Sequence, residues 1–429
     1  MSEKVVVVGG GLAGLSSAAR LAKKGYQVQL LEKTPKLGGR AITIPLKGFN
    51  FNFGAHAIYG RDQSVLRKFE SELGLKVDWK HFSPKKAFYD MGSFTTPMPS
   101  TLERLYRTKI LDAENKVRFA YEIIKTLTSL ERGQEDILIG DYLQDEPEQI
   151  RDLFLTLASS NFFSNEPEKI PSPLFFRYYK RLFAAQNPVA YIGGGWQSIV
   201  DGLAKILEDH GGEIVNKEKI SKVEMDGRRV TAIHGKESVY TADRFIFCVP
   251  PKELVSMFEE TPYQHLFEEY NRYRSNQVVV YDIGLKERIT SPYTYIYHKE
   301  ERVFITDISH YDQTCTPEGG QLLQAISYMN PEEMEQDKGK EKISSIESVY
   351  DKHYPGWRDL LVAKRLSKRA TVQEIKCVED QRLMPIQFYS LNNSYFAGDW
   401  CQGEGQLSEL SFSSAYEVTQ RILAHPDRK

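Results

Sequence analysis

The N-terminal part of the chain joins an apolar run to three spaced glycines. Val5 to Val8 are four β-branched residues in succession, which is typical of a parallel strand buried on both faces. Gly9, Gly11 and Gly14 follow at the spacing G-x-G-x-x-G. At this spacing the first glycine permits a tight turn, the second lets a pyrophosphate approach the backbone, and the third lets a helix pack against the strand. We therefore expect a βαβ unit that binds a dinucleotide.

The following residues continue the pattern of such a unit. One face of the predicted helix carries the apolar residues Leu12, Leu15, Ala19 and Ala22. Gly25 suits the end of this helix, and a second strand is predicted over 27–31. The strand leads to Glu32, which follows Gly11 by 21 residues. Its carboxylate is expected to accept hydrogen bonds from the hydroxyls of the adenosine ribose. NADP is disfavoured because the negative charge of Glu32 would repel a 2′-phosphate. The alternative is a glycine-rich turn in a sheet that binds nothing.

A second glycine pair distinguishes FAD from NAD. Gly38-Gly39-Arg40 follows the acidic residue closely, and a second backbone loop is needed to cover a longer, buried cofactor. Arg40 would add a fixed positive charge near the pyrophosphate or the flavin carbonyls. The alternative is a surface turn with a solvated arginine.

The C-terminal region supplies a third expected contact. Residues 394–399 are typical of a short buried strand that ends in Gly398-Asp399, and an amphipathic helix is predicted over 407–423. Asp399 is expected to accept a hydrogen bond from a ribityl hydroxyl. The partly positive helix N-terminus would favour the anionic reduced flavin. Simple helix capping or turn chemistry is the alternative for Asp399.

These segments together resemble the flavoprotein group that contains amine oxidases, protoporphyrinogen oxidases and phytoene desaturases. The matching segments are 5–14, 30–33, 38–40, 191–197 and 396–399. The phytoene-desaturase-like branch is favoured by Phe53-Gly54-Ala55-His56, by residues 275–285 and by Gly398-Asp399-Trp400. The resemblance implies non-covalent FAD, with a backbone contact from Ile220 to the adenine. The full set of expected cofactor contacts is Gly9, Gly11, Leu12, Ala13, Gly14, Glu32, Lys33, Gly38, Gly39, Arg40, Gly54, Ala55, His56, Ile220, Gly398, Asp399, Leu407 and Ser408.

The sequence also departs from that group. Asn52 stands where the group often has aspartate, Glu409 and Leu410 stand where small residues are usual, and Ser413-Ser414 replaces Ser-Gly. A different packing at the flavin edge is therefore expected. Cys377 and Cys401 are poorly placed for covalent attachment of a flavin.

The expected fold class is α/β, with a Rossmann-like FAD-binding domain of the glutathione-reductase type and a discontinuous α+β substrate domain. The FAD-binding domain would comprise residues 1–58, 190–250 and 385–429. The substrate domain would comprise residues 59–189 and 251–384. Within it, helices are predicted over 105–130 and strands over 277–283 and 302–308.

Two further features carry alternative interpretations. His56 is the candidate catalytic residue, positioning substrate or assisting proton transfer, and a structural histidine is the alternative. In segment 174–183 an apolar face of Phe175, Phe176, Tyr179, Leu182 and Phe183 is favoured as core or pocket wall. A membrane-surface helix is the alternative.

The bulk composition excludes some partners. With 56 basic and 58 acidic side chains the net charge is −2, which gives no general attraction to nucleic acid or to anionic lipid. No run approaches the ~20 apolar residues of a spanning helix. No secretory signal or metal-binding cysteine pattern is recognised. We expect a cytoplasmic chain without a metal site, and peripheral contact with a membrane is left open.

These observations predict an FAD-dependent oxidoreductase that takes a hydride from an apolar or amine substrate and passes electrons to oxygen or another acceptor. Hydride transfer to flavin N5 is chemistry of the cofactor and needs no catalytic triad. One alternative is a binding protein like the Rab escort and GDP-dissociation-inhibitor proteins, which resemble this fold; Gly9, Gly11, Gly14, Glu32 and Asp399 argue against it. The other alternative, an NAD-dependent dehydrogenase, is disfavoured by Gly38-Gly39-Arg40.

Overall fold

A five-stranded parallel sheet forms the first half of the molecule. The computed structural model describes residues 3–54, 57–133 and 137–425. In the order β10-β2-β1-β14-β20, every neighbouring pair of strands is parallel. The strands are β1 (Lys4–Val8), β2 (Gln27–Glu32), β10 (Glu213–Asn216), β14 (Arg244–Phe247) and β20 (Ser394–Phe396). Because all five run the same way, their carboxyl ends meet at one edge, where α/β sheets bind ligands.

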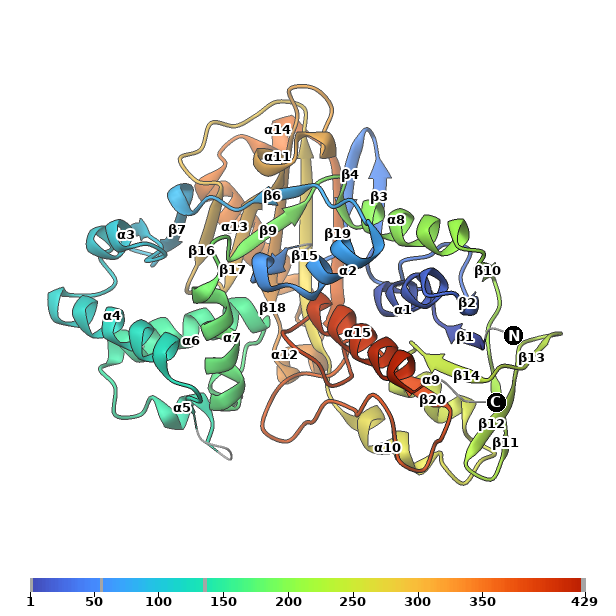
Figure 1. Cartoon of the computed structure of the whole chain (residues 1–429). Helices are drawn as coiled ribbons and strands as arrows, with labels where there is room; N and C mark the ends of the chain where they lie inside the picture. Colours follow the sequence, from blue (N-terminus) through green and yellow to red (C-terminus); the bar gives the residue numbers. More distant parts are fainter. Residues whose placement is uncertain (1–2, 55–56, 134–136, 426–429) are drawn as a thin grey trace.

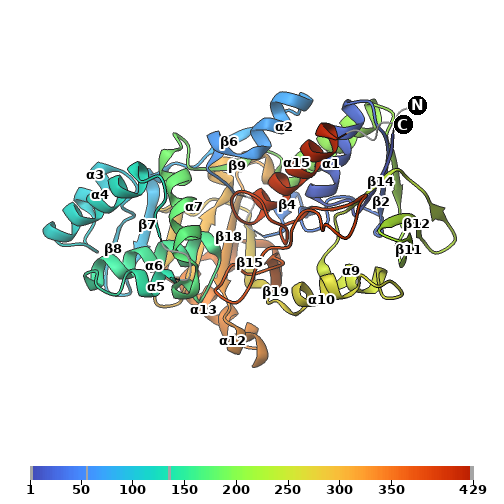
Figure 2. The ribbon, with the colours of Figure 1, turned by 60° about the horizontal axis from the view of Figure 1, so that its bottom comes forward.

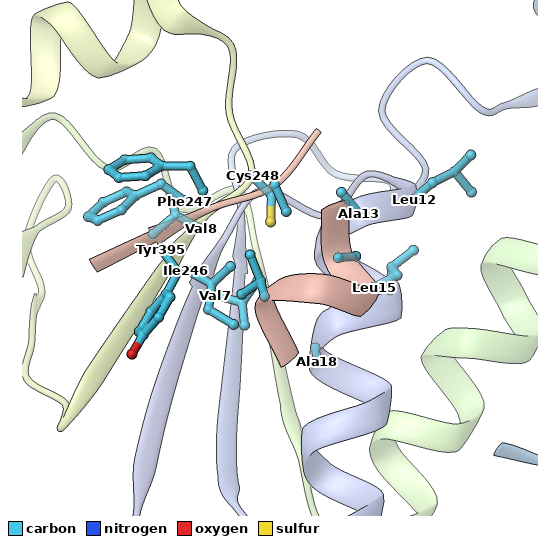
Figure 3. Packing of buried hydrophobic residues seen from close by; sticks show 14 of the residues in the cluster. Val7, Val8, Leu12, Ala13, Leu15, Ala18, Ile246, Phe247, Cys248 and Tyr395 are labelled. Carbon is cyan, nitrogen blue, oxygen red and sulfur yellow. The ribbon is translucent and has the colours of Figure 1, made fainter. Parts of the chain in front are cut away.

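Helices bury both faces of this sheet. Three helices cover one face: α1 (Leu12–Lys23), α8 (Gly195–Asp209) and α15 (Ser408–Ala424). Helix α1 packs against both α8 and α15. On the other side lie α9 (Pro251–Met257) and α10 (His265–Arg272), and the ring of Phe247 makes an edge-to-face contact with Phe258 at 5.5 Å between ring centroids. Figure 3 shows Val7 and Ile246 beside α1, with Phe247 farther from that helix. Burial on both faces explains the uninterrupted apolar run Val5 to Val8, as predicted.

A seven-stranded mixed sheet forms the second half. Its order is β19-β15-β18-β17-β16-β7-β8, and only the pair β16–β7 is parallel. The strands are β7 (Ala87–Asp90), β8 (Thr95–Pro97), β15 (Asn276–Leu285), β16 (Tyr295–His298), β17 (Val303–Asp307), β18 (Gln321–Tyr328) and β19 (Leu361–Gln373). One face packs against α13 (Gly339–His353), and the other faces an aromatic core shared with a helical region.

That helical region lies at the end of the molecule away from both termini (Figure 1, Figure 2). It comprises α3 (Leu102–Arg107), α4 (Ala113–Thr128), α5 (Ile139–Tyr142), α6 (Glu148–Phe162) and α7 (Ser172–Ala184). The predicted helical stretch 105–130 is thus two helices, because Asp112 caps a new one by accepting from the backbone N–H of Asn115 at 2.9 Å.

The aromatic face of α7 belongs to the core. The buried residues of this helix include Phe175, Phe176, Tyr178, Tyr179 and Leu182, and Phe183 is half-buried. Two of the basic residues of α7 also contact the protein, since Lys180 donates to Ser129 O at 2.6 Å and Arg181 donates to Gln63 O at 2.8 Å. The preferred prediction for segment 174–183 is confirmed, and the alternative of a membrane-surface helix is wrong for this segment.

Smaller elements complete the fold. The remaining strands are β3 (Thr43–Leu46), β4 (Phe49–Asn52), β5 (Ile58–Tyr59), β6 (Trp79–His81), β9 (Val189–Ile192), β11 (Lys222–Asp226), β12 (Arg229–His234) and β13 (Val239–Tyr240). The remaining helices are α2 (Val65–Leu73), α11 (Ile308–Tyr311), α12 (Pro331–Glu335) and α14 (Trp357–Leu360). Of the helices in the described part of the chain, none has the length and apolarity to cross a bilayer.

The two sheets draw on different stretches of sequence. The parallel sheet takes strands from within 1–58, 190–250 and 385–429, and the mixed sheet from within 59–189 and 251–384. The strand pair β5–β9 connects residues 58–59 with 189–190, where the expected boundaries lie. The exact domain boundaries remain a prediction.

Candidate functional site

A cavity of about 610 Å³ lies at the carboxyl edge of the parallel sheet. Its parallel-sheet side is lined by Val8, Gly9, Gly11, Leu12, Ala13, Glu32, Gly38, Gly39, Arg40, Cys248, Gly398, Asp399, Leu407 and Ser408. Its other side includes Phe53, Phe163, Arg369, Thr371, Val372 and Glu374, so strand β19 of the mixed sheet closes the cavity. The cavity therefore lies between the two sheets.

The three glycines of the N-terminal motif serve different purposes. A Cβ on Gly9 would lie 2.4 Å from Cys248 O, and a Cβ on Gly14 would lie 1.9 Å from Gly9 O. A Cβ on Gly11 would meet nothing nearer than Gly38 O at 4.0 Å. Gly9 and Gly14 are therefore required by packing, whereas Gly11 leaves open space on the cavity side. Gly14 does not line the cavity.

Two helix N-termini face the cavity without side-chain caps. Helix α1 begins after Gly11 and helix α15 after Leu407, and neither residue gives the helix a side-chain hydrogen bond. Leu407 has φ 58°, an unusual value for a residue with a Cβ. Leu12, Ala13 and Ser408 line the cavity beside these N-termini. Uncapped N–H groups and the helix dipole give both places an affinity for negative charge.

Glu32 is held firmly at the end of β2. The residue is 6% exposed, its Oε2 accepts from Gly10 N at 2.7 Å, and its Oε1 accepts from Thr34 N at 2.8 Å. Each carboxylate oxygen has more than one lone pair, so hydroxyl donors can still approach from the cavity. Glu32 is thus buried, oriented and able to accept further hydrogen bonds.

Arg40 lies in a cluster of charges that sequence reasoning did not predict. Its Nη2 lies 2.5 Å from Oδ1 of Asp399, and its Nη1 lies 3.9 Å from Oε2 of Glu374. Burial by itself would lower the pKa of Arg40, but Asp399 and Glu374 outweigh it and raise that pKa. Burial raises the pKa of Glu374, against the opposing effect of Arg40. Within the described residues Nη1 of Arg40 is buried without a hydrogen-bond partner, so it still has protons to donate.

The remaining expected contacts have varied positions. Ile220 and Gly54 line the cavity, as does Lys33, whose Nζ pairs with Oε1 of Glu253 at 2.7 Å. Ala55 and His56 lie outside the described residues, so the catalytic role of His56 stays a prediction.

Two of the departures in sequence have structural explanations. Asn52 is buried, and its Oδ1 accepts from Trp196 N at 3.0 Å and Thr43 Oγ1 at 2.7 Å, which satisfies the start of α8. Glu409 is buried and accepts from Arg181 Nη2 at 2.6 Å. Both side chains stabilise junctions between elements and do not line the cavity.

Sequence reasoning missed the wall formed by the mixed sheet. The missed lining residues on that side are Phe163, Arg369, Thr371, Val372 and Glu374, and on the other side Trp196, Cys248, Glu253 and Trp400. No local motif marks the residues of β19, because their position in the cavity follows from the pairing of β19 with β15. Cys248 directly follows β14, at the same edge as Glu32, so its place in the parallel sheet was a usable signal.

Comparisons with known proteins agree with this architecture. A family model described as flavin-containing amine oxidoreductase matches residues 12–344. The chain is 22% identical over 318 residues to the chloroplastic/chromoplastic 15-cis-phytoene desaturase of an Oncidium hybrid cultivar, covering 68% of this chain and 54% of that protein. The chain spans about half the length of the curated relatives it matches.

Solved structures share the whole fold. An oxidoreductase from Methanosarcina mazei superposes with a TM-score of 0.81 at 18% identity, covering 97% of this chain and 100% of the other. Cyclohexylamine oxidase from Brevibacterium oxydans gives a TM-score of 0.71 at 14% identity, covering 100% of both chains. The predicted α/β fold class, with a parallel Rossmann-like sheet and a second mixed sheet, is confirmed.

Proposed function

Because the chain belongs to the family of flavin-containing amine oxidoreductases, we propose that it binds FAD non-covalently and oxidises an apolar or amine substrate by hydride transfer to flavin N5. The observation that carries this proposal is the cavity of about 610 Å³, which brings together the segments around Gly11, Glu32, Arg40 and Asp399.

Different parts of the cavity suit the pyrophosphate, the adenosine and the flavin ring of FAD. The open space at Gly11 and the uncapped start of α1 suit a pyrophosphate. Glu32 suits the hydroxyls of the adenosine ribose, and Ile220 lies where an adenine contact is expected. The N-terminus of α15 at Leu407 and Ser408 suits an electron-rich flavin edge.

The charge cluster has its own part in the proposal. Asp399 can accept from a ribityl hydroxyl while it holds Arg40, since the carboxylate has lone pairs to spare. The unpartnered Nη1 of Arg40 remains available to a phosphate or carbonyl oxygen. Non-covalent binding is favoured because burial raises the pKa of the Cys248 thiol, which lines the cavity and so stays protonated.

A bound flavin supplies the hydride acceptor, and the protein's part is to orient the substrate and exclude water. Phe53, Phe163 and Val372 line the side of the cavity opposite the glycine motif. Such a wall favours substrates with an apolar carbon skeleton. We propose His56, two positions after Gly54, as the residue that positions substrate or assists proton transfer.

The cavity also bears on the alternatives. A binding protein without a cofactor has no need of the open space at Gly11 or of two uncapped helix N-termini beside a buried carboxylate. An NAD-dependent dehydrogenase has no need of the second loop, in which Gly38 N donates to Gly10 O at 2.8 Å and fixes the loop against the first. Both alternatives are therefore disfavoured.

The test is spectroscopic. The purified protein is expected to be yellow, with a flavin spectrum that bleaches anaerobically with dithionite, and acid should release free FAD. A panel of amines, porphyrinogens and polyenes, scored by anaerobic flavin bleaching, then identifies the substrate class. A colourless preparation that takes up neither FAD nor NAD would reject the proposal, and uptake of NAD alone would favour the dehydrogenase.

A further inference from the structure

Half of the large apolar side chains that face solvent gather on one part of the molecule. Among the described residues twelve such side chains are exposed, and six of them lie between positions 102 and 130. They are Leu102, Tyr106, Val117, Tyr121, Ile124 and Leu130. We call these six the α3–α4 apolar face. Helices α3 and α4 lie at the end of the molecule away from the chain termini (Figure 1, Figure 2).

Helix α4 presents an apolar stripe to solvent. The stripe consists of Val117, Tyr121 and Ile124, which are 72%, 60% and 58% exposed. Their spacing of i, i+4 and i+7 places them on one side of the helix. The opposite side buries Phe119 together with Glu122, whose carboxylate is paired with the guanidinium of Arg132. In an ordinary surface helix the apolar stripe would face the protein core and a charged residue such as Glu122 would face solvent.

The exposed face extends beyond α4 in both directions. Leu102 and Tyr106 lie one turn apart on α3 and are 82% and 81% exposed. Leu130, just after α4, is 95% exposed. Single exposed apolar residues are ordinary, but a gathering of this kind marks an interaction surface.

Basic side chains flank the stripe. At about 100° per residue, Lys125 falls on one flank of it, together with Glu114 and with Arg118, which is paired with Glu146 at 2.6 Å. Lys116 falls on the other flank. From the start of α3 to the end of α4, the charged residues that are not buried are five basic and three acidic. These are Arg107, Lys109, Lys116, Arg118 and Lys125, against Glu103, Asp112 and Glu114. Arg107 and Arg118 are paired with Glu103 and Glu146. Among the described residues Lys116 and Lys125 are therefore the cations beside the stripe that have no carboxylate partner.

We propose that the α3–α4 apolar face docks onto the surface of a lipid bilayer that contains anionic lipid. Apolar side chains in a row enter the boundary of the acyl region, while flanking lysines extend their ammonium groups to the headgroups. A second copy of the chain suits this face less well. Two copies joined here would bring the lysines Lys116 and Lys125 of both copies into one interface, where like charges repel.

The proposal is independent of what the flavin oxidises, but it bears on how substrate is obtained. The face lies on the same half of the molecule as the apolar wall of the flavin cavity, because α6 and α7 pack under α4 and share a core with β15 and β18. An enzyme docked in this way would have direct access to compounds dissolved in lipid.

The experiment is vesicle flotation of the purified, flavin-loaded protein. Vesicles of phosphatidylcholine alone are compared with vesicles that also contain phosphatidylglycerol, at low and high salt. A triple variant, V117S/Y121S/I124S, removes the stripe. The matched control removes three exposed apolar side chains elsewhere, V239S/L366S/Y389S, which are 58%, 43% and 99% exposed in the native chain.

The native protein and the control variant are expected to float with the anionic vesicles, less so at high salt. The stripe variant should show a partition coefficient lower by about tenfold or more, because three apolar side chains no longer leave water. Its thermal midpoint and flavin absorbance should match those of the native protein, since all three positions are exposed.

Three results would overturn the proposal. The first is that the native protein floats with neither kind of vesicle. The second is that the stripe variant floats as well as the control variant. The third is a native dimer, seen by light scattering, that the stripe variant breaks while no flotation occurs; this would make a second copy the occupant. A colourless protein that still floats would instead reject the FAD proposal and leave this one standing.

Discussion

Nη2 of Arg40 lies 2.5 Å from Oδ1 of Asp399, although 359 positions separate the two residues in the chain. Asp399 is 3% exposed, and its other oxygen, Oδ2, accepts from Glu374 N at 3.2 Å. One carboxylate therefore joins the loop after β2, the end of β19 and the end of β20. The candidate cofactor cavity is complete only when these three distant segments have folded against one another.

Substitution of Asp399 tests that relationship. Asp399→Asn keeps the shape of the side chain but leaves Arg40 with only Glu374 as a charged partner. We expect the free energy of unfolding to fall by about 1–3 kcal/mol and FAD to bind more weakly, measured by urea unfolding and FAD titration. Asp209→Asn, in the exposed pair with Lys205 at 2.9 Å, should cost less than about 0.5 kcal/mol. Equal stability of the two variants would contradict a structural role for the Arg40–Asp399 pair.

The glycines of the N-terminal motif should respond differently to alanine. A Cβ at position 14 would lie 1.9 Å from Gly9 O, so Gly14→Ala should lower the unfolding free energy by about 1–3 kcal/mol or more. A Cβ at Gly11 meets no atom nearer than 4.0 Å. Gly11→Ala should therefore keep the thermal midpoint of the cofactor-free protein and lose FAD affinity instead. If Gly11→Ala bound FAD normally, the open space would not be a pyrophosphate site.

Glu32 allows a test of the ribose contact. Glu32→Arg introduces a positive charge at a buried position and should give a colourless protein, while Glu32→Gln, with one acceptor oxygen fewer, should retain part of the bound FAD. The measurement is the ratio of flavin to protein absorbance after gel filtration. Glu213→Gln on the neighbouring strand β10, where the side chain is exposed, is the control and should retain full colour. Stoichiometric FAD in Glu32→Arg would rule out the proposed contact.

The parallel half of the fold was predictable because its signals are local. Strand, glycine turn, helix and second strand follow one another between Val5 and Glu32, and each has its own sequence pattern. The positions of Gly38 and Asp399 were predicted from spacing and resemblance, and both line the cavity. The ion pair between Arg40 and Asp399 was not predicted, because no local pattern records which side chains meet across a cavity.

The mixed sheet shows where local patterns fail. Glu374 enters the cavity just after β19, whose long pairing with β15 contains register shifts. A shift of one residue turns every following side chain to the opposite face, so sequence alone does not tell which residues of β19 face the cavity. In α4 the helix was predictable, but its orientation, with Tyr121 outward and Glu122 inward, depends on the partner Arg132.

Glu166 should contribute a pH-dependent part of the stability. Burial by itself would raise its pKa, but Lys169, Lys376 and Arg274 outweigh burial and lower that pKa to about 2 from 4.5. The ionised form is thus favoured in the folded state, so its contribution is present above pH 4.5 and is lost as the pH falls toward 2. The difference in unfolding free energy between the native protein and Glu166→Gln should shrink from about 1–2 kcal/mol near neutral pH, allowing for solvent screening. Urea unfolding at several pH values measures it, and exposed Glu318→Gln should show no such difference.

Glu409, which replaces the small residue usual in similar flavoproteins, should fix the N-terminus of α15 beside the cavity. Its side chain is 5% exposed; Oε2 accepts from Ser64 Oγ at 2.7 Å, and Oε1 accepts from Val65 N and Arg181 Nη2, both at 2.6 Å. Glu409→Ala leaves Arg181 largely buried without its carboxylate partner and removes the acceptor of Val65 N at the start of α2, so the unfolding free energy should fall by about 3–5 kcal/mol. FAD affinity should fall as well, because Leu407 and Ser408 lose their anchor, and Glu409→Gln should show a smaller loss of both. Glu417→Ala, exposed on the same helix, should change stability by less than about 0.5 kcal/mol. Urea unfolding and FAD titration decide the matter: if the alanine variants at 409 and 417 behaved alike, Glu409 would have no part in holding α15 at the cavity.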